Sequence, residues 1–208
     1  MKIVIFGATG RTGRLLVDQA LAAGYEVTAF VRDPDRLGEL QEFLTPFRGD
    51  IFDAGRVERA VTGQGAALSV IGPVDSSRGV MATAAQNITA AMRKQGVYRL
   101  IWLTGAGVPD PNDQPKLVDR VFTGVLGLLQ KDLVEDSKQA VDIIRTSGLD
   151  WTVVRAPRLL DGEPVGTLRV GYAGLGTGFR IKRVDVARFM LEALADVSYV
   201  RQAPVVSN

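Results

Sequence analysis

Short apolar runs alternate with longer helical patterns along most of this chain, and this alternation limits its possible folds more than any other feature. The runs are rich in β-branched or aromatic residues and show little polar alternation, which is typical of strands buried on both faces of a sheet. Helices between such strands make the crossovers that a parallel sheet needs. The predicted strands are residues 2–6, 26–31, 45–50, 66–72, 99–104 and 150–156, and the predicted helices are residues 11–23, 78–95 and 133–147.

A glycine-rich stretch, GATGRTG, joins the first predicted strand to the first predicted helix. Glycine at this place lets the backbone approach a pyrophosphate closely, while the helix N-terminus offers free N–H groups and a partial positive charge. The spacing G-x-x-G-x-x-G departs from the commoner G-x-G-x-x-G, so the position in the chain carries the argument. For Thr12 a helix-capping role is the alternative. We therefore expect a Rossmann-like doubly wound parallel sheet in which a pyrophosphate is bound by Gly7, Thr9, Gly10, Arg11, Thr12 and Gly13.

The character of the sequence changes after residue 156, where glycine becomes frequent before a last predicted helix at 184–195 and a strand at 200–206. Since no repeat or linker interrupts the chain, we expect residues 1–208 to form one domain with a small cap at about 106–132 and 157–183. Within the cap one helical face carries apolar side chains, which fits either a mobile lid or a helix packed on the core. These side chains are Leu117, Val121, Phe122, Val125 and Leu129.

Composition excludes several classes of chemistry. The chain has no cysteine and no histidine, so disulfides, the usual zinc sites and Ser-His or Cys-His nucleophiles are absent, and we expect no metal. Its 25 basic and 23 acidic residues are dispersed, which gives no electrostatic footprint for nucleic acid. No apolar stretch reaches membrane-spanning length or forms a signal peptide, so we expect a cytoplasmic protein that binds neither nucleic acid nor membranes.

The residue after the second predicted strand bears on which dinucleotide is bound. Roughly 20 residues after the glycine turn, NAD-preferring proteins place a carboxylate on the ribose hydroxyls. This chain has Arg32 there and Arg36 shortly after it. A guanidinium can bind a 2′-phosphate through two hydrogen bonds, so NADP is the favoured cofactor over NAD. A solvated arginine beside Asp33 is the alternative.

Further candidates follow the ends of the third, fourth and fifth predicted strands. Asp50 could accept from the adenine amino group with Ile51 against the ring, or Asp50 could start a turn. Ile71 and Gly72 would lie along the pyrophosphate and the nicotinamide ribose, or Gly72 with Pro73 could form a plain turn. Thr104 could turn its hydroxyl toward the nicotinamide, or it could simply pack.

Taken together, these motifs resemble the atypical short-chain dehydrogenase/reductase superfamily, in its NAD(P)H-binding, NmrA-like branch, and most closely the biliverdin-IXβ reductase or flavin reductase group. The resemblance rests on IFGATGRTG, GYEVTAFVRDPDRL, RGDIFDAGRVERAVTGQGA, NITAAMRKQGVYRLI and RTSGLDWTVVRAP, and it covers most of residues 1–158 and the final helix. It implies NADP, a monomer, an open apolar pocket and an acceptor such as a flavin or tetrapyrrole. It also implies that Pro157 and Arg158 close over the nicotinamide.

Departures from that family narrow the chemistry. No tyrosine is followed by lysine in the Tyr-x-x-x-Lys pair, which argues against a conventional alcohol dehydrogenase. Where the flavin reductases carry a serine and histidines, this chain has Gly105 and Ser137, with Lys138 adjacent, and this puts tetrapyrrole reduction in doubt. Thr104, Ser137 and Lys138 are the catalytic candidates.

Hydride transfer to a flavin or quinone needs little proton machinery, because the accepting ring delocalises charge and takes its proton from water. We therefore expect an NADPH-dependent reductase of a planar acceptor. The alternative is an NmrA-like protein that senses NADP(H) without turnover, and an isomerase or epimerase is a third, weaker candidate. We expect a monomer, although a dimer through the final helix is also compatible with the sequence.

Overall fold

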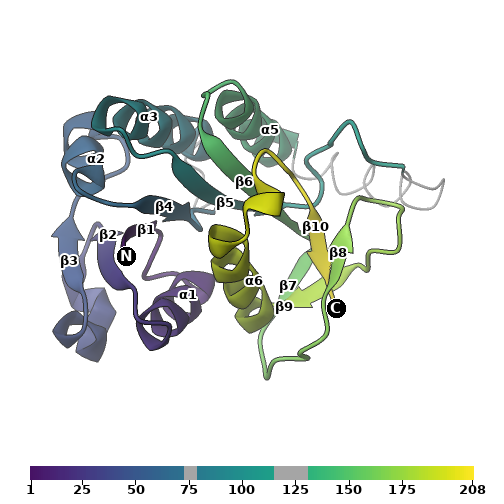
Figure 1. The fold of residues 1–208 in the computed structure, drawn as a ribbon, viewed down its shortest axis with the longest axis horizontal. Coiled ribbons are helices and arrows are strands. Elements are labelled where there is room, and N and C mark those ends of the chain that lie inside the picture. The colour runs from purple at the N-terminus through teal and green to yellow at the C-terminus, as the bar shows by residue number, and fades with distance from the viewer. Residues whose placement is uncertain (73–78, 115–130) are drawn as a thin grey trace.

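A mixed sheet forms the centre of the molecule, of which the computed structural model describes residues 1–72, 79–114 and 131–208. Among these residues eight strands are joined in the order β3-β2-β1-β4-β5-β6-β10-β8 (Figure 1). All neighbouring pairs run parallel except β10 and β8, so the predicted doubly wound α/β fold is confirmed. The strands are β1 (Lys2–Phe6), β2 (Glu26–Val31), β3 (Thr45–Arg48), β4 (Ala66–Ser69), β5 (Arg99–Gly105), β6 (Asp150–Ala156), β8 (Arg169–Gly171) and β10 (Val205–Ser207).

The strand order reverses at β1, and this reversal fixes where a ligand can bind. Ile3 of β1 lies in register with Val27 of β2 on one side and with Ala66 of β4 on the other. The chain connections from β1 and β4 lead away in opposite directions, which leaves a crevice at the carboxyl ends of these two strands. Phe6, the last residue of β1, runs directly into the glycine turn.

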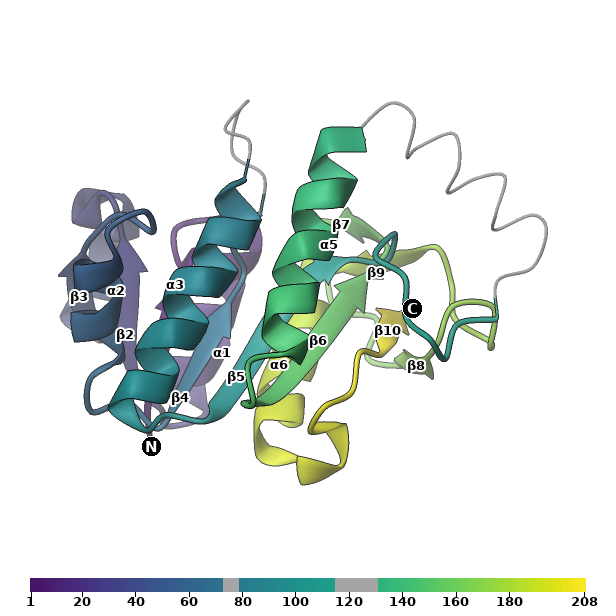
Figure 2. The same cartoon turned by 90° about the horizontal axis from the view of Figure 1, so that it is seen from above.

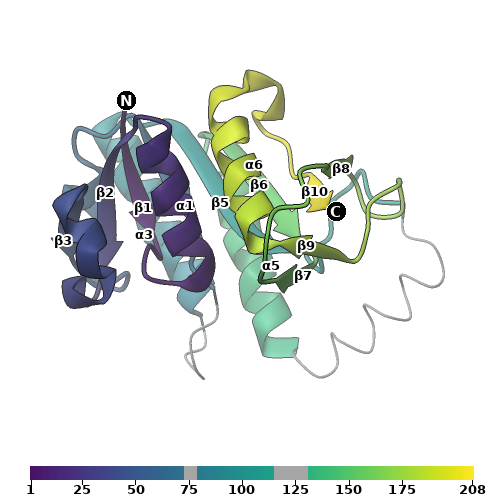
Figure 3. The same cartoon turned by 90° about the horizontal axis from the view of Figure 1, so that it is seen from below.

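Helices cover both faces of the sheet. Helices α2, α3 and α5 lie on one face, seen from above in Figure 2. Helices α1 and α6 lie side by side on the opposite face, seen from below in Figure 3. Their bounds are α1 (Arg11–Ala22), α2 (Ala54–Val61), α3 (Val80–Gln95), α5 (Lys131–Arg145) and α6 (Arg183–Ala195), with short 3₁₀ helices at Pro34–Glu42 and Val197–Tyr199.

Side chains of the central strands alternate between two hydrophobic clusters. Val4 and Phe6 of β1 point into the cluster under α2, α3 and α5, whereas Ile3 and Ile5 point into the cluster under α1 and α6. All four are fully buried, as the near-continuous apolar runs predicted. Burial on both faces leaves the carboxyl ends of the strands as the accessible edge of the sheet.

The glycine-rich region after β6 forms the cap. Its strands β7 (Arg158–Leu160) and β9 (Arg180–Lys182) pair in parallel as a separate two-stranded sheet. β8 and β10 extend the main sheet beside them. This small sheet lies next to the N-terminal end of α6, beyond the carboxyl ends of the central strands (Figure 3).

Three strand ends differ from the sequence prediction. The third strand stops at Arg48: the Gly49 amide makes the last hydrogen bond to β2, 2.9 Å to the Val31 carbonyl, and Asp50 then begins a turn. The fourth stops at Ser69, after which Val70, Ile71 and Gly72 leave the sheet and line the pocket described below. The last begins only at Val205, since Arg201 adopts a left-handed turn with φ 58°. The predicted lid face at 117–129 lies outside the described residues.

Candidate functional site

The glycine turn is tight because two of its glycines have no room for a side chain. Gly7 adopts φ +86°, which favours glycine, and a Cβ on it would lie 3.1 Å from backbone atoms of Val70 and Ile71. A Cβ on Gly13 would lie 2.1 Å from the Gly7 carbonyl oxygen, well inside any real contact. Gly13 therefore allows the first turn of α1 to pack directly onto the loop that precedes it.

The N-terminus of α1 is uncapped. Gly10 is the N-cap residue, no side chain caps the helix, and the first turn contains no acidic residue. The capping alternative for Thr12 is therefore wrong: Thr12 lies inside the helix and is 8% exposed. The amide N–H groups and the positive end of the helix dipole thus face the pocket, and no side chain of the described residues caps them, which suits a pyrophosphate.

By contrast, the N-terminal end of α3, which also borders the pocket, is already neutralised. The Asp136 carboxylate on α5 accepts from the amides of Met81 at 3.0 Å and Ala82 at 2.9 Å. Sequence analysis did not find this contact, because residues far apart in the chain make it. Of these two helix ends only that of α1 is open to an anionic ligand.

One pocket of about 1670 Å³ runs along the carboxyl ends of the strands from β3 to the cap. It is larger than the 300–1,000 Å³ or so of most small-molecule sites, so it has room for a dinucleotide and a second molecule. All the predicted cofactor residues line it, namely Gly7, Thr9, Gly10, Arg11, Thr12, Gly13, Arg32, Arg36, Asp50, Ile51, Ile71, Gly72, Thr104, Gly105, Pro157 and Arg158.

The end of the pocket near β2 and β3 carries the predicted phosphate-reading arginines. The Asp33 carboxylate accepts from the Asp35 amide at 3.2 Å and caps a 3₁₀ helix, and it forms no ion pair with Arg32. The guanidinium of Arg32 has no carboxylate within 4.0 Å among the described residues. Asp50 makes the turn that was its alternative role, with one carboxylate oxygen 3.0 Å from the Phe52 amide. It still lines the pocket.

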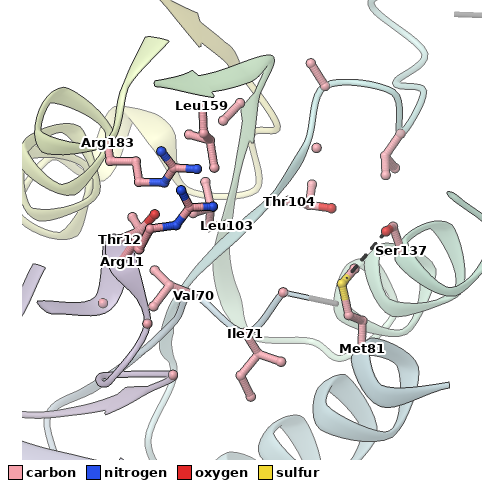
Figure 4. A pocket seen from close by; sticks show the side chains of 18 of the residues that line it. Arg11, Thr12, Val70, Ile71, Met81, Leu103, Thr104, Ser137, Leu159 and Arg183 are labelled. Atoms are coloured by element: carbon pink, nitrogen blue, oxygen red, sulfur yellow. Dashed lines mark hydrogen bonds between the residues drawn. The ribbon is translucent and has the colours of Figure 1, made fainter. Parts of the chain in front are cut away.

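Thr104, at the end of β5, is the most informative side chain at the other end. It is 6% exposed, and its hydroxyl has no hydrogen-bond partner in the described part of the chain. Figure 4 shows that this hydroxyl lies on the side facing Ser137. A buried hydroxyl without a partner costs stability. Of the two alternatives for Thr104, a hydrogen bond to a ligand therefore explains the hydroxyl better than packing does. Cβ atoms built at nearby Gly72 and Gly105 meet nothing within 4 Å, which leaves open space beside it.

The other two catalytic candidates lie differently. Ser137 lines the pocket opposite Thr104, but its hydroxyl donates to the Leu133 carbonyl at 2.8 Å and lies 3.8 Å from the Met81 sulfur (Figure 4). Lys138 is exposed and does not line the pocket. Since neighbouring helical residues point about 100° apart, α5 directs Ser137 inward and Lys138 outward. The structure thus brings Thr104 and Ser137 together without Lys138.

Sequence analysis missed a group of basic residues on the cap side. Arg183, which is 8% exposed, donates to Asp161 at 2.7 Å, and Arg11 of the glycine turn reaches the other oxygen of Asp161 at 3.3 Å. Their guanidinium groups lie next to each other in Figure 4. Arg169 and Arg180 also line the pocket. The excess of basic over acidic residues in the segment 157–183 was the available signal.

A buried ion pair anchors the loop that follows β5. Arg155, fully buried, makes two hydrogen bonds of 2.7 Å to Asp113 and also donates to the carbonyls of Val108 and Ala203. Burial by itself raises the pKa of Asp113, but hydrogen bonds from Arg155 and from the amides of Asp110 and Ala173 together lower it below its ordinary value. The pair ties residues 106–113 to β6, β10 and the cap.

The family model for NAD(P)H-binding proteins matches residues 7–197 of the chain. This chain belongs to that NAD(P)H-binding family. Its Rossmann-like fold is the one that this family assignment implies. An uncharacterised chloroplastic protein of Arabidopsis thaliana is 28% identical to it, over 93% of this chain and 71% of that protein. The chain spans about half the length of the dihydroflavonol 4-reductases of Arabidopsis thaliana and Hordeum vulgare that it also matches.

Solved structures of other proteins share the fold. ChuY, an anaerobillin reductase from Escherichia coli O157:H7, has a TM-score of 0.77 at 24% identity, covering 100% of this chain and 97% of that one. A short-chain dehydrogenase/reductase from Veillonella parvula DSM 2008, solved in complex with NADP, has a TM-score of 0.79 at 20% identity, covering 100% and 94%. At these identities the likeness concerns the fold.

No helix within residues 1–72, 79–114 and 131–208 is both long enough and apolar enough to cross a membrane. In the same ranges no cluster of three or more His, Cys, Asp or Glu side chains could hold a metal ion.

Proposed function

We propose that the protein is an NADPH-dependent reductase that delivers hydride to a planar acceptor such as a flavin or quinone. The observation that carries this proposal is the continuity of one pocket, which joins the uncapped end of α1 to the unpartnered hydroxyl of Thr104 and extends beyond it. When bound, the reduced dinucleotide supplies the hydride, and the acceptor takes its proton from water.

Each region of the pocket has its own part in the proposed reaction. The amides at the start of α1 bind the pyrophosphate, and Arg32 holds the 2′-phosphate with a bidentate guanidinium. Thr104 completes its hydrogen bond to the ring end of the dinucleotide or to the acceptor. Apolar side chains of Ile71, Leu103 and Leu159 shape the walls that exclude water.

The chain offers no tyrosine for acid–base chemistry in the described part of this pocket. Burial raises the pKa of Tyr172, with a smaller contribution from the nearby charge of Asp110, and the phenol donates to Gln202 at 2.6 Å. Burial likewise raises the pKa of Tyr199. Neither ring lines the pocket. These side chains can therefore support hydride transfer to a ring that delocalises the added charge, because such an acceptor needs no acid from the protein.

The sensor alternative keeps the same cofactor site and lacks turnover. It is favoured by one observation, namely that the Ser137 hydroxyl is already satisfied by the Leu133 carbonyl. In keeping with the reductase proposal we place the protein in the cytoplasm as a monomer that binds neither nucleic acid nor membranes.

The absorbance of the reduced nicotinamide distinguishes the reductase from the sensor. Purified protein is mixed with NADPH and either FMN or a small naphthoquinone. Loss of absorbance that scales with protein concentration supports the reductase. Saturable NADPH binding, seen by calorimetry, without turnover of any flavin or quinone contradicts the reductase and favours the sensor. If calorimetry detects no binding heat with any nicotinamide dinucleotide, both the reductase and the sensor proposals are wrong.

A further inference from the structure

Two arginines lie side by side on the small sheet of the cap. Arg158 of β7 and Arg180 of β9 are in-register partners, so their Cα atoms are separated by roughly 4.8 Å. Their chain neighbours Leu159 and Ile181 pack on the hydrophobic cluster under α1 and α6. Because side chains alternate along a strand, both guanidinium groups extend from the opposite face of this sheet. Both residues are exposed and line the pocket.

Like charges directly opposite each other destabilise a sheet unless an anion lies between them. In residues 1–72, 79–114 and 131–208 no carboxylate comes within 4.0 Å of either guanidinium. The nearby acids are already used: Asp161 pairs with Arg11 and Arg183, and the buried Asp185 lies 3.5 Å from Arg188 and accepts from the Val165 amide. The described chain therefore supplies no counter-ion to this pair.

The anions of a dinucleotide would be held elsewhere in the pocket. The proposed pyrophosphate site is the uncapped start of α1, and the proposed 2′-phosphate site is Arg32, at the end of β2. Arg158 and Arg180 stand on the cap instead, beyond β6, where the main chain of Arg158 is fixed by its hydrogen bond to the Phe179 carbonyl at 3.2 Å. A third arginine without a carboxylate partner in the described residues, Arg169, lines the same side.

We propose that Arg158 and Arg180 form a binding site for an anionic group, phosphate or carboxylate, carried by the planar acceptor. This inference rests on the proposed reductase function and specifies its substrate class. Paired guanidinium groups match the planar or tetrahedral arrangement of such oxygens and hold them by charge-assisted hydrogen bonds. A ring with an anionic substituent is then oriented by the cap, while a neutral ring of the same shape is held by apolar contact alone.

FMN and riboflavin share one ring system and differ by a phosphate, so they test the site directly. Binding is measured by quenching of flavin fluorescence in the presence of NADP⁺, which does not depend on turnover. The unaltered protein is expected to bind FMN at least about 10-fold more tightly than riboflavin. Arg180→Gln is expected to remove most of this difference by weakening FMN alone, and Arg180→Lys to give an intermediate value. Arg59→Gln, an exposed position on α2 outside the pocket, is the matched control.

Several outcomes overturn the inference. Equal affinity for FMN and riboflavin in the unaltered protein does so, as does equal weakening of both flavins by Arg180→Gln. A similar loss of NADPH affinity in that variant would assign the pair to the cofactor instead, and retained NADPH affinity shows that the variant is folded. If riboflavin and FMN are reduced equally well, the reductase stands and the anion site fails. If FMN binds through Arg180 but is never reduced, the anion site stands and the reductase fails.

Competition identifies the class of anion. Inorganic phosphate and succinate are each added to the FMN-binding assay at constant ionic strength. Displacement by phosphate supports a phosphorylated acceptor, and displacement by succinate supports a carboxylated one. Failure of both to displace FMN in the unaltered protein overturns the site.

Discussion

At the scale of single residues, the site depends on side chains that the fold leaves without partners. Within the described residues the buried Thr104 hydroxyl has no hydrogen-bond partner, and the Arg32 guanidinium has no carboxylate partner, since the Asp33 carboxylate caps a 3₁₀ helix. The buried hydroxyl costs stability in the free protein and regains it when a ligand binds, whereas the exposed guanidinium is solvated until then. Each can therefore be tested by a substitution that affects ligand binding and stability differently.

Thr104→Val replaces the hydroxyl by a methyl group of similar size. We expect the free energy of unfolding to stay the same or rise by up to about 1 kcal/mol, because an unsatisfied polar atom is removed. The kcat/KM for NADPH-dependent FMN reduction should fall about 2- to 10-fold, as for one lost hydrogen bond. Urea denaturation and steady-state kinetics measure the two, with Thr104→Ser as the control that keeps the hydroxyl. A variant that loses stability and keeps its kinetics would assign Thr104 to packing.

Arg32→Glu tests which dinucleotide the pocket prefers. The carboxylate repels a 2′-phosphate and can accept from ribose hydroxyls, so NADPH affinity should fall about 100-fold while NADH affinity changes little. Calorimetry with both reduced dinucleotides measures this, with Arg59→Gln as the control on an exposed arginine outside the pocket. Equal losses for NADH and NADPH, or no change in either, would show that Arg32 does not read the 2′-phosphate.

At the scale of elements, α1 and α3 both start beside the pocket and differ in how their N-termini are satisfied. The Asp136 carboxylate satisfies the first amides of α3, whereas α1 follows its N-cap residue Gly10 with no side-chain cap. Only α1 has the glycine turn that brings a ligand close to those amides. The position of α1 relative to that turn is set by Gly13, where the helix meets the Gly7 carbonyl.

Gly13→Ala places a methyl group 2.1 Å from that carbonyl oxygen and should force α1 away from β1. We expect a loss of about 1–3 kcal/mol in the free energy of unfolding without any ligand present, together with weaker NADPH binding. Gly10→Ala is the control, since its Cβ would lie 3.3 Å from the same oxygen. Thermal and urea denaturation measure the difference. Gly13→Ala no less stable than Gly10→Ala would disprove the steric account.

At the scale of the whole molecule, the Arg155–Asp113 pair joins the loop after β5 to the cap and to β10. Arg155 is fully buried and lies between segments that are distant in the sequence. Removal of one member of a buried pair leaves the other charged and unsatisfied, which is more damaging than loss of a surface pair. Stability should therefore depend on the charge of Asp113.

Asp113→Asn should lower the free energy of unfolding by about 3 kcal/mol at neutral pH. The folded pKa of Asp113 lies below its unfolded value near 3.8, so its contribution is complete well above that value and is lost as pH falls through the folded pKa. The unaltered protein should thus lose this part of its stability in acid, and the variant should not. Urea denaturation at neutral pH and at about pH 3 measures it, with Asp18→Asn on the exposed face of α1 as the control. Parallel acid profiles for protein and variant would contradict the assignment.

The order of elements and the cofactor edge of the site could be predicted because their signals are local. Apolar periodicity marks each strand and helix, and the predicted cofactor residues follow strand ends that a parallel sheet must bring to one edge. Asp136, Asp161 and the in-register pair Arg158–Arg180 could not be found in this way, because their partners are fixed by tertiary packing. Lys138 was misplaced for a related reason: adjacency to Ser137 in sequence says nothing about which side of α5 faces inward.

The steric role of Gly13 changes how a glycine in this turn is interpreted in relatives. A descendant that no longer used any nucleotide would still need it, since the obstacle to a methyl group is the chain's own carbonyl. If that glycine is retained in distant homologues, it therefore indicates that their first helix packs against the first strand in the same way. Evidence that a homologue still holds a dinucleotide has to come from an acid-free, uncapped first helical turn.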